Sequence, residues 1–117
     1  MEFKEYQEKA MTTCMPSSNN FSYMFLNLVG EVGEFASKVA KAIRKEENSI
    51  ECNDLAVTVT DRELPKEAGD ILWQLSGLCT VMGWELEDIA QQNLDKLAAR
   101  KAVGTIDGNG DGIIRSK

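Results

Sequence analysis

The chain has 117 residues, of which 13 are Lys or Arg and 19 are Asp or Glu, so its formal net charge is −6. A chain of this length forms one domain, and its acidic balance argues against a nucleic-acid or anionic-membrane surface, because such ligands bind basic faces. Histidine is absent, which excludes a Ser-His-Asp or Cys-His nucleophile and a His-ligated zinc site. The cysteines Cys14, Cys52 and Cys79 form no C-x-x-C pair, which favours a reducing cytoplasm.

Apolar residues recur every three or four positions along most of the chain, and this period predicts amphipathic helices. The first helix is expected over residues 2–13, where Pro16 and the polar residues after it end the pattern. The second is expected over residues 20–45, with a core face made by Phe25, Leu28, Val32, Phe35, Val39 and Ile43. No apolar run approaches the roughly 18 residues that a membrane-spanning helix needs, so no membrane contact is expected.

Residues 46–60 are polar or β-branched and are predicted to form a loop. A third helix is expected from a cap at Thr60 or Asp61 to Gly83, with Pro65 in its first turn. Its core stripe is formed by Ala68, Ile71 or Leu72, Leu75, Leu78 or Cys79, and Met82. The fourth helix is expected over residues 86–103, with an inward face made by Ile89, Ala90, Leu94, Leu97 and Ala98.

This pattern predicts an all-α fold, a four-helix bundle followed by a Gly-rich tail at residues 104–117. Its apolar faces are wide enough that we expect oligomers.

Acidic residues stand in apolar surroundings on two of these helices. Glu31 and Glu34 interrupt a long uncharged stretch, and Glu67 and Asp70 precede another. A spacing of three places each pair on one helix face. Four carboxylates gathered between helices repel one another unless a cation neutralises them, and oxygen ligands select Mg²⁺ or Mn²⁺ over zinc. The four acids are therefore candidate metal ligands, and a solvent-exposed helix surface is the alternative.

The fourth helix carries the complementary charge. Asn93, Lys96 and Arg100 share one face, as donors to a phosphate chain would, although a solvated basic stripe has the same pattern. Lys38, seven residues after Glu31, lies on the face of the first acidic pair and is also a candidate phosphate ligand, with an ordinary surface lysine as the alternative. Trp73 follows Asp70 by three residues and is a candidate for stacking on a base, with packing at a subunit interface as the alternative.

Taken in order, Glu31-x-x-Glu34, Glu67-x-x-Asp70 and Asn93-x-x-Lys96 with Arg100 resemble the signature of the MazG-type, all-α nucleoside triphosphate pyrophosphohydrolases. The resemblance runs from about Tyr6 to Arg115 and implies a single MazG-like domain over residues 1–117. It also implies a homodimer or homotetramer that binds Mg²⁺ through the four acids. The implied reaction cleaves a nucleoside triphosphate to the monophosphate and pyrophosphate. The 32 residues between the two acidic pairs make that segment longer than is usual in the family.

We therefore expect a cytoplasmic enzyme that removes noncanonical or surplus nucleotides. Glu34 is the candidate for orienting or deprotonating water, Lys96 and Arg100 for holding phosphates, and Asn93 for binding the sugar or a phosphate oxygen. Two alternatives stay open. One is a pyrophosphohydrolase of the same superfamily that acts on a phosphoribosyl-nucleotide, and the other is a noncatalytic helical interaction module whose acids lie on the surface.

Overall fold

The computed structural model describes residues 1–44 and 63–104, and helices are the only regular secondary structure in these two ranges. The helices are α1 (Phe3–Met11), α2 (Phe21–Arg44), α3 (Glu63–Val81) and α4 (Leu86–Ala102), with a short 3-10 turn, η1 (Pro16–Ser18), between α1 and α2. The predicted all-α architecture and the order of its four helices are confirmed. The loop at residues 46–60, the cap at Thr60 or Asp61 and the tail beyond Gly104 lie outside the described residues.

The helix ends follow from local chemistry. Asn20 Oδ1 accepts a hydrogen bond of 2.8 Å from the Tyr23 amide and so caps the first turn of α2. Pro65 lies in the first turn of α3, where its missing N–H breaks no helical bond. Gly83 has φ +77°, a left-handed conformation that favours glycine, and the Trp84 amide bonds back to the Cys79 carbonyl at 2.8 Å. These contacts end α3 as the sequence predicts.

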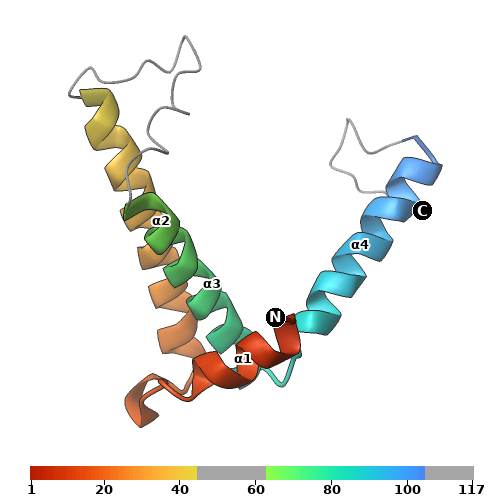
Figure 1. The fold of residues 1–117 in the computed structure, drawn as a ribbon, viewed down its shortest axis with the longest axis horizontal. Helices are drawn as coiled ribbons and strands as arrows, with labels where there is room; N and C mark the ends of the chain where they lie inside the picture. Colours follow the sequence, from red (N-terminus) through yellow and green to blue (C-terminus); the bar gives the residue numbers. More distant parts are fainter. Residues whose placement is uncertain (45–62, 105–117) are drawn as a thin grey trace.

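The helices α2 and α3 are antiparallel and lie side by side (Figure 1). At one level of this contact, α3 carries Gly77, which has no side chain. A Cβ at this position would overlap the Met24 sulfur of α2. Met24 is fully buried there. Gly77 therefore allows α2 and α3 to pack closely at this level.

The indole of Trp73 joins α3 to α1. Its Nε1 donates hydrogen bonds to the Ala10 carbonyl at 3.0 Å and to Thr13 Oγ1 at 3.1 Å. Ala10 is buried, and its carbonyl lies close to the C-terminal end of α1. The indole N–H therefore joins the Thr13 amide and hydroxyl as a donor to the Ala10 carbonyl at the end of α1.

Gln7 joins α1 to both α3 and α4. Its Nε2 donates to Thr80 Oγ1 at 2.9 Å and to the Trp84 carbonyl at 3.1 Å, while its Oε1 accepts from the Leu86 amide at 2.8 Å. The Leu86 amide is the first of α4 and has no acceptor within its own helix. A side chain of α1 thus supplies the cap of α4.

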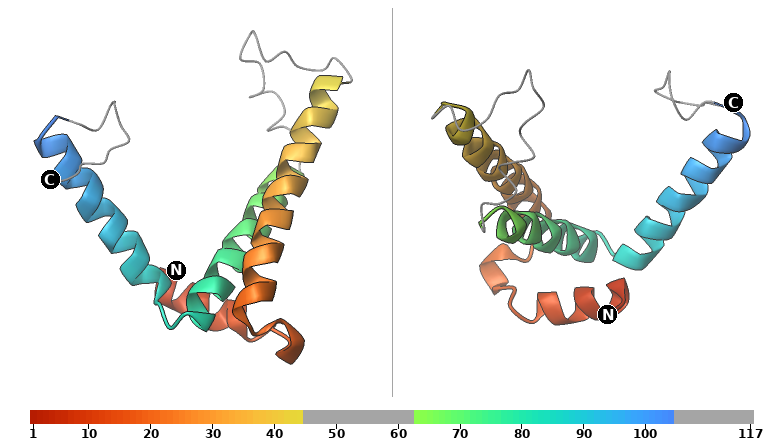
Figure 2. Two further views of the ribbon diagram at one scale, coloured as in Figure 1. Left: turned by 180° about the vertical axis from the view of Figure 1, so that it is seen from behind. Right: turned by 45° about the horizontal axis from the view of Figure 1, so that its top comes forward.

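From this junction α4 diverges from the α2–α3 pair, and the chain has the shape of a V whose base is α1 (Figures 1 and 2). The radius of gyration is 17.4 Å, whereas a compact domain of this length has one of about 13 Å. The four helices therefore have an open arrangement within a single chain.

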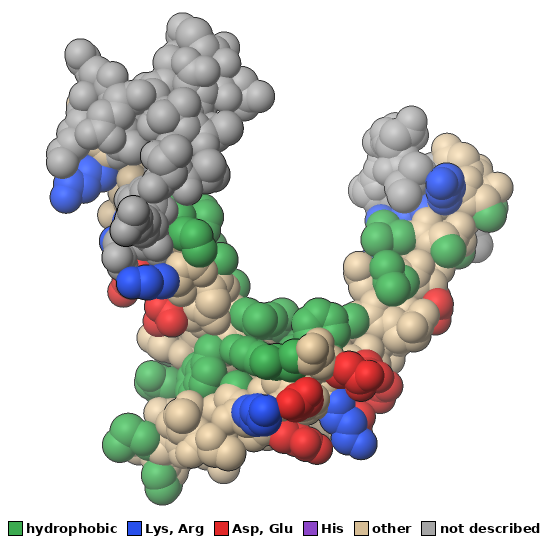
Figure 3. All heavy atoms as spheres, in the orientation of Figure 1, with side chains coloured by type: hydrophobic (Ala, Val, Ile, Leu, Met, Phe, Trp, Pro, Cys, Tyr) green, Lys and Arg blue, Asp and Glu red, His purple; other side chains and the backbone are tan. Residues whose placement is uncertain are grey.

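The predicted core faces need correction, because part of each is exposed. The residues predicted to point inward but found exposed are Phe25, Val32, Ala68, Met82, Leu94 and Ala98. On α2 the reason is that apolar residues cover a wide arc, of which α3 covers the side that carries Met24 and Glu31. A second side stays open, and we call it the α2 stripe; it consists of Phe21, Phe25, Val29 and Val32, which are 51%, 45%, 56% and 48% exposed. Figure 3 shows hydrophobic side chains along the inner sides of the V.

Candidate metal centre

Three carboxylates converge between α2 and α3. Glu31 comes from α2, and Glu67 and Asp70 come from positions one turn apart on α3. Each of the three offers an oxygen, and these oxygens all lie within 4.8 Å of one another. Glu31 and Glu67 are half-buried and Asp70 is exposed, so the cluster is open to solvent on one side. The predicted convergence of acids from two helices is present for these three residues.

The cluster lacks the donors that carboxylates of this burial need. Glu31 Oε1 and Glu67 Oε1 are buried, and neither has a hydrogen-bond partner among residues 1–44 and 63–104. Burial, followed by the charges of Asp70, Glu34 and Glu67, raises the pKa of Glu31 above its ordinary value. A divalent cation would supply the missing positive charge, and an all-oxygen donor set fits a hard ion. These residues therefore fit a bound divalent cation.

Glu34 and Lys38 border the cluster on α2. Glu34 is exposed and lies outside the group of three converging oxygens, although its charge contributes to the raised pKa of Glu31. Lys38 Nζ lies 4.0 Å from Glu67 Oε2, at the limit of an ion pair. One cationic side chain thus offsets part of the negative charge, and the acids remain in excess.

The comparison with known families gives this cluster its context. Residues 19–104 match the MazG nucleotide pyrophosphohydrolase domain. The chain belongs to the MazG family. The matched range includes all four predicted acids and the predicted phosphate-binding residues of α4. Nucleotide pyrophosphohydrolase activity, in general terms, is the function of this domain, and the MazG family generally uses a divalent metal.

A phage protein shares most of this MazG domain. The "Gene 37 protein" of Mycobacterium phage L5 is 38% identical over 96 residues, which cover 81% of this chain and 78% of the phage protein. Its name states no activity. No solved structure matches the chain. Within the described ranges, none of the helices combines the length and the apolar character needed to cross a membrane.

The predicted phosphate-binding residues of α4 are separated from the acids within this chain. Asn93, Lys96 and Arg100 lie on α4, which diverges from the α2–α3 pair (Figure 2). Asn93 and Lys96 are exposed, and Arg100 is half-buried. Within one chain, the structure therefore does not join α4 to the carboxylates. For Trp73, the indole N–H bonds to α1, and stacking of its ring on a base stays a prediction.

Three polar neighbours of the carboxylates were not predicted from the sequence. Asn27 and Gln74 form a hydrogen bond of 2.7 Å across the α2–α3 interface. The sequence signal that indicates them is their spacing, because Asn27 precedes Glu31 by four residues and Gln74 follows Asp70 by four, which places each amide on the same helix face as an acid. The third is Tyr6 of α1, whose pKa is raised by burial and then by the charge of Asp70.

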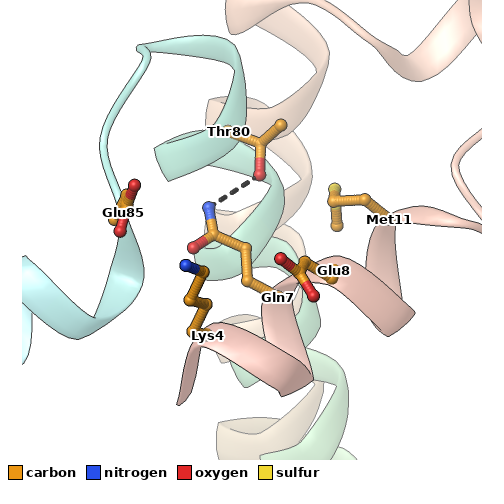
Figure 4. Close-up of a pocket in the computed structure, with 6 residues that line it drawn as sticks. All are labelled: Lys4, Gln7, Glu8, Met11, Thr80 and Glu85. Carbon is orange, nitrogen blue, oxygen red and sulfur yellow. Dashed lines mark hydrogen bonds between the residues drawn. The ribbon is translucent and has the colours of Figure 1, made fainter. Parts of the chain in front are cut away.

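A separate pocket of about 260 Å³ lies where α1 meets the end of α3 and the start of α4 (Figure 4). Figure 4 shows Gln7 reaching from α1 to Thr80 across this space. The lining is formed by Lys4, Gln7, Glu8, Met11, Thr80 and Glu85, and it shares no residue with the carboxylate cluster. Its side chains carry charges of both signs, so the pocket has no strong preference for an anion or a cation.

Proposed function

We propose that the protein hydrolyses a nucleoside triphosphate to the nucleoside monophosphate and pyrophosphate, with Mg²⁺ or Mn²⁺ held by Glu31, Glu67 and Asp70. The observation that carries this proposal is the convergence of these three carboxylates in a MazG domain, with two buried oxygens that have no hydrogen-bond partner in the described residues. Glu34 completes the set of four acids from its place one turn along α2.

The reaction requires charge neutralisation, because a triphosphate and an acidic cluster repel each other. A bound divalent cation supplies that neutralisation and lowers the pKa of water. The exposed carboxylate of Glu34 accepts the proton as water attacks the α-phosphorus. A bond forms between the water oxygen and the α-phosphorus. The bond from the α-phosphorus to the oxygen that bridges to the β-phosphorus breaks, and pyrophosphate leaves with that oxygen.

Donors on α4 hold the phosphate chain in this proposal. Lys96 and Arg100 bind phosphate oxygens, and Asn93 binds the sugar or another phosphate oxygen. Lys38, which already lies 4.0 Å from Glu67, is a further phosphate ligand. Trp73 is retained as a candidate base contact.

A homodimer or homotetramer explains how α4 meets the acids. The α2 stripe is exposed on each chain, and α4 diverges from the pair that carries the carboxylates. Burying apolar surface contributes about 25 cal/mol per Å² to association, before the entropy cost of joining two chains. We infer that a second copy packs on the α2 stripe and brings its own α4 over the carboxylates of the first copy. The function and assembly proposed here are consistent with an enzyme of nucleotide-pool housecleaning in the cytoplasm.

The decisive experiment follows both the products and the attacked phosphorus. A panel of ribo- and deoxyribonucleoside triphosphates is incubated with Mg²⁺, with Mn²⁺ or with EDTA, and monophosphate and pyrophosphate are quantified. In H₂¹⁸O, attack at the α-phosphorus places the label in the monophosphate. Nucleoside diphosphate as the main product, label in pyrophosphate, or unchanged activity in EDTA would contradict the proposal.

A further inference from the structure

Two amide side chains are paired inside the α2–α3 interface. Asn27 Nδ2 donates a hydrogen bond of 2.7 Å to Gln74 Oε1, and Gln74 Nε2 donates to the Met24 carbonyl at 3.4 Å. Gln74 is only 3% exposed. The amide of Gln74 is therefore bonded to α2 through both its oxygen and its nitrogen. The bond to Met24 is buried, and the bond to Asn27 is partly buried.

This amide pair lies directly beside the carboxylates. Along α2, Asn27 is one turn before Glu31, and along α3, Gln74 is one turn after Asp70. Because the two helices are antiparallel, these spacings put the amide layer next to the carboxylate layer. On its other side, Met24 lies over Gly77.

The carboxylates have little of their own to hold them in this arrangement. Glu31 Oε1 and Glu67 Oε1 lack hydrogen-bond partners in the described part of the chain, and like charges at this separation repel. Contact between a methionine and a glycine is adaptable, since the thioether has several rotamers. A hydrogen bond between two amides is directional, and sliding one helix by a turn would leave both amides without their partners.

We propose that Asn27 and Gln74 are positioning residues that fix the register of α2 against α3, so that Glu31, Glu67 and Asp70 converge before a cation binds. The pair acts through the carboxylates and touches neither cation nor nucleotide. Its effect on cation affinity rests on the proposed function, whereas its effect on register does not.

The test uses Gln74→Leu and Asn27→Leu in the full chain with two readouts. The first is the nuclear Overhauser effect between the Met24 methyl group and the Gly77 α-protons in EDTA, which reports register without metal. The second is the affinity for Mn²⁺ alone, from electron paramagnetic resonance. We expect either variant to weaken the Overhauser effect and to lower Mn²⁺ affinity by tenfold or more, and the two substitutions together to lower it no further.

A swapped pair provides the rescue. Asn27→Gln combined with Gln74→Asn keeps the summed length of the two side chains, so we expect it to restore the Overhauser effect and to bring the Mn²⁺ affinity within threefold of the wild-type value. A purely structural role would instead lower the thermal midpoint of every variant and leave Mn²⁺ affinity unchanged. Gln91→Leu makes the same chemical change on the exposed surface of α4, where Gln91 bonds to Asp95 at 2.9 Å, and should alter neither readout.

Each outcome decides the proposal. An Overhauser effect and a Mn²⁺ affinity that stay within twofold in Gln74→Leu would overturn it, as would a swapped pair that recovers neither. Should Gln74→Leu fail to fold, Asn27→Leu carries the same test, because Asn27 is only half-buried. If the wild-type chain binds no Mn²⁺ while the Overhauser effect still depends on the pair, the proposed function fails and the positioning role stands.

Discussion

At the scale of single residues, the structure gives neighbouring acids different surroundings. Glu31 and Glu67 each bury one oxygen, while Glu34 and Asp70 are exposed. In the proposed site the half-buried acids anchor the cation, and the exposed Glu34 meets the water. A carboxylate that is half-buried and lacks a hydrogen-bond donor costs stability in the metal-free chain. Function and stability are therefore opposed at this cluster.

Glu67→Gln should separate the two effects. The substitution removes one negative charge, so we expect turnover to fall about a hundredfold, which corresponds to about 2.7 kcal/mol of transition-state stabilisation. The thermal midpoint in EDTA should stay equal or rise, since repulsion within the cluster is relieved. Glu8→Gln, at an exposed position of α1, is the control and should change neither quantity. Wild-type turnover of Glu67→Gln across a Mg²⁺ titration would remove Glu67 from the site.

The raised pKa of Glu31 predicts how stability depends on pH. Burial first, and then Asp70, Glu34 and Glu67, raise this pKa above its ordinary value of 4.5. Between the ordinary and the raised value the folded chain holds a proton that the unfolded chain has released. The free energy of unfolding in EDTA should therefore fall as the pH rises through this window. Urea titrations at several pH values measure the slope.

Two changes should alter this dependence of the unfolding free energy on pH. Glu31→Gln has no proton to release at this position, so its unfolding free energy should fall less between pH 4.5 and pH 7. Saturating Mg²⁺ should reverse the trend, because the ion binds the deprotonated cluster of the folded state. An identical slope in the wild-type chain and in Glu31→Gln would assign the pH dependence to other groups.

At the scale of elements, α2 and α3 meet in layers of unlike chemistry. Met24 lies over Gly77, Asn27 pairs with Gln74, and Glu31 meets the acids of α3. The first of these layers sets how closely the helices pack, since Gly77 leaves its space to a side chain of α2. Glycine inside a helix costs about 1 kcal/mol relative to alanine, and the close contact offsets that cost.

Gly77→Ala and Gly69→Ala should therefore have opposite effects. Both replace a glycine of α3, but a Cβ on Gly69 meets nothing within 4 Å, whereas a Cβ on Gly77 overlaps the buried Met24 sulfur. We expect Gly69→Ala to raise the free energy of unfolding by up to about 1 kcal/mol. Gly77→Ala should lower it by about 1 kcal/mol, because the Met24 thioether, although flexible, is fully buried and must displace its neighbours to make room. Equal shifts in chemical denaturation would contradict the close packing of α2 on α3.

The sequence predicts the helices well because their apolar residues keep a period of three to four, and because Pro65 and Gly83 lie near helix ends. The sequence does not predict which face of each helix is buried. Apolar side chains cover so wide an arc of α2 that periodicity alone could not tell that α3 takes the side of Glu31 and leaves Val32 open. The acids were found because charge is rare in such a helix. The Asn27–Gln74 pair was not, since a single amide in a sequence does not reveal its partner on another helix.

At the scale of the whole molecule, the V-shaped chain exposes apolar surface that a compact monomeric domain would bury. Hydrophobic side chains lie along the inner sides of the V in Figure 3. The direction of α4 depends on tertiary contacts such as those of Gln7 with Thr80 and Leu86, which no local pattern encodes. The proposed assembly covers exposed apolar surface, because a second copy would pack on the α2 stripe and bring its own α4 over the carboxylates.

Mixing two inactive variants tests whether the site is shared between chains. Glu67→Gln lacks an acid and Lys96→Ala lacks a phosphate ligand, so each alone should have low turnover. If acids and α4 come from different chains, a mixed dimer contains one intact site. An equimolar mixture after subunit exchange should then regain roughly a quarter of wild-type activity, because half of the dimers are mixed and each has one of two sites intact. Activity no greater than the mean of the two variants would place both groups in one chain.

The close packing of Met24 on Gly77 also makes this methionine a chemical reporter of opening. Peroxide converts an accessible thioether to the sulfoxide, and Met1, Met15 and Met82 are 86%, 65% and 43% exposed. Met24 is fully buried, so its sulfur meets the oxidant only when α2 and α3 separate. A polar sulfoxide at this buried position would fit poorly between α2 and α3 and would hold the two helices apart until it is reduced. Oxidative damage at this sulfur would therefore spread the acids without altering any of them.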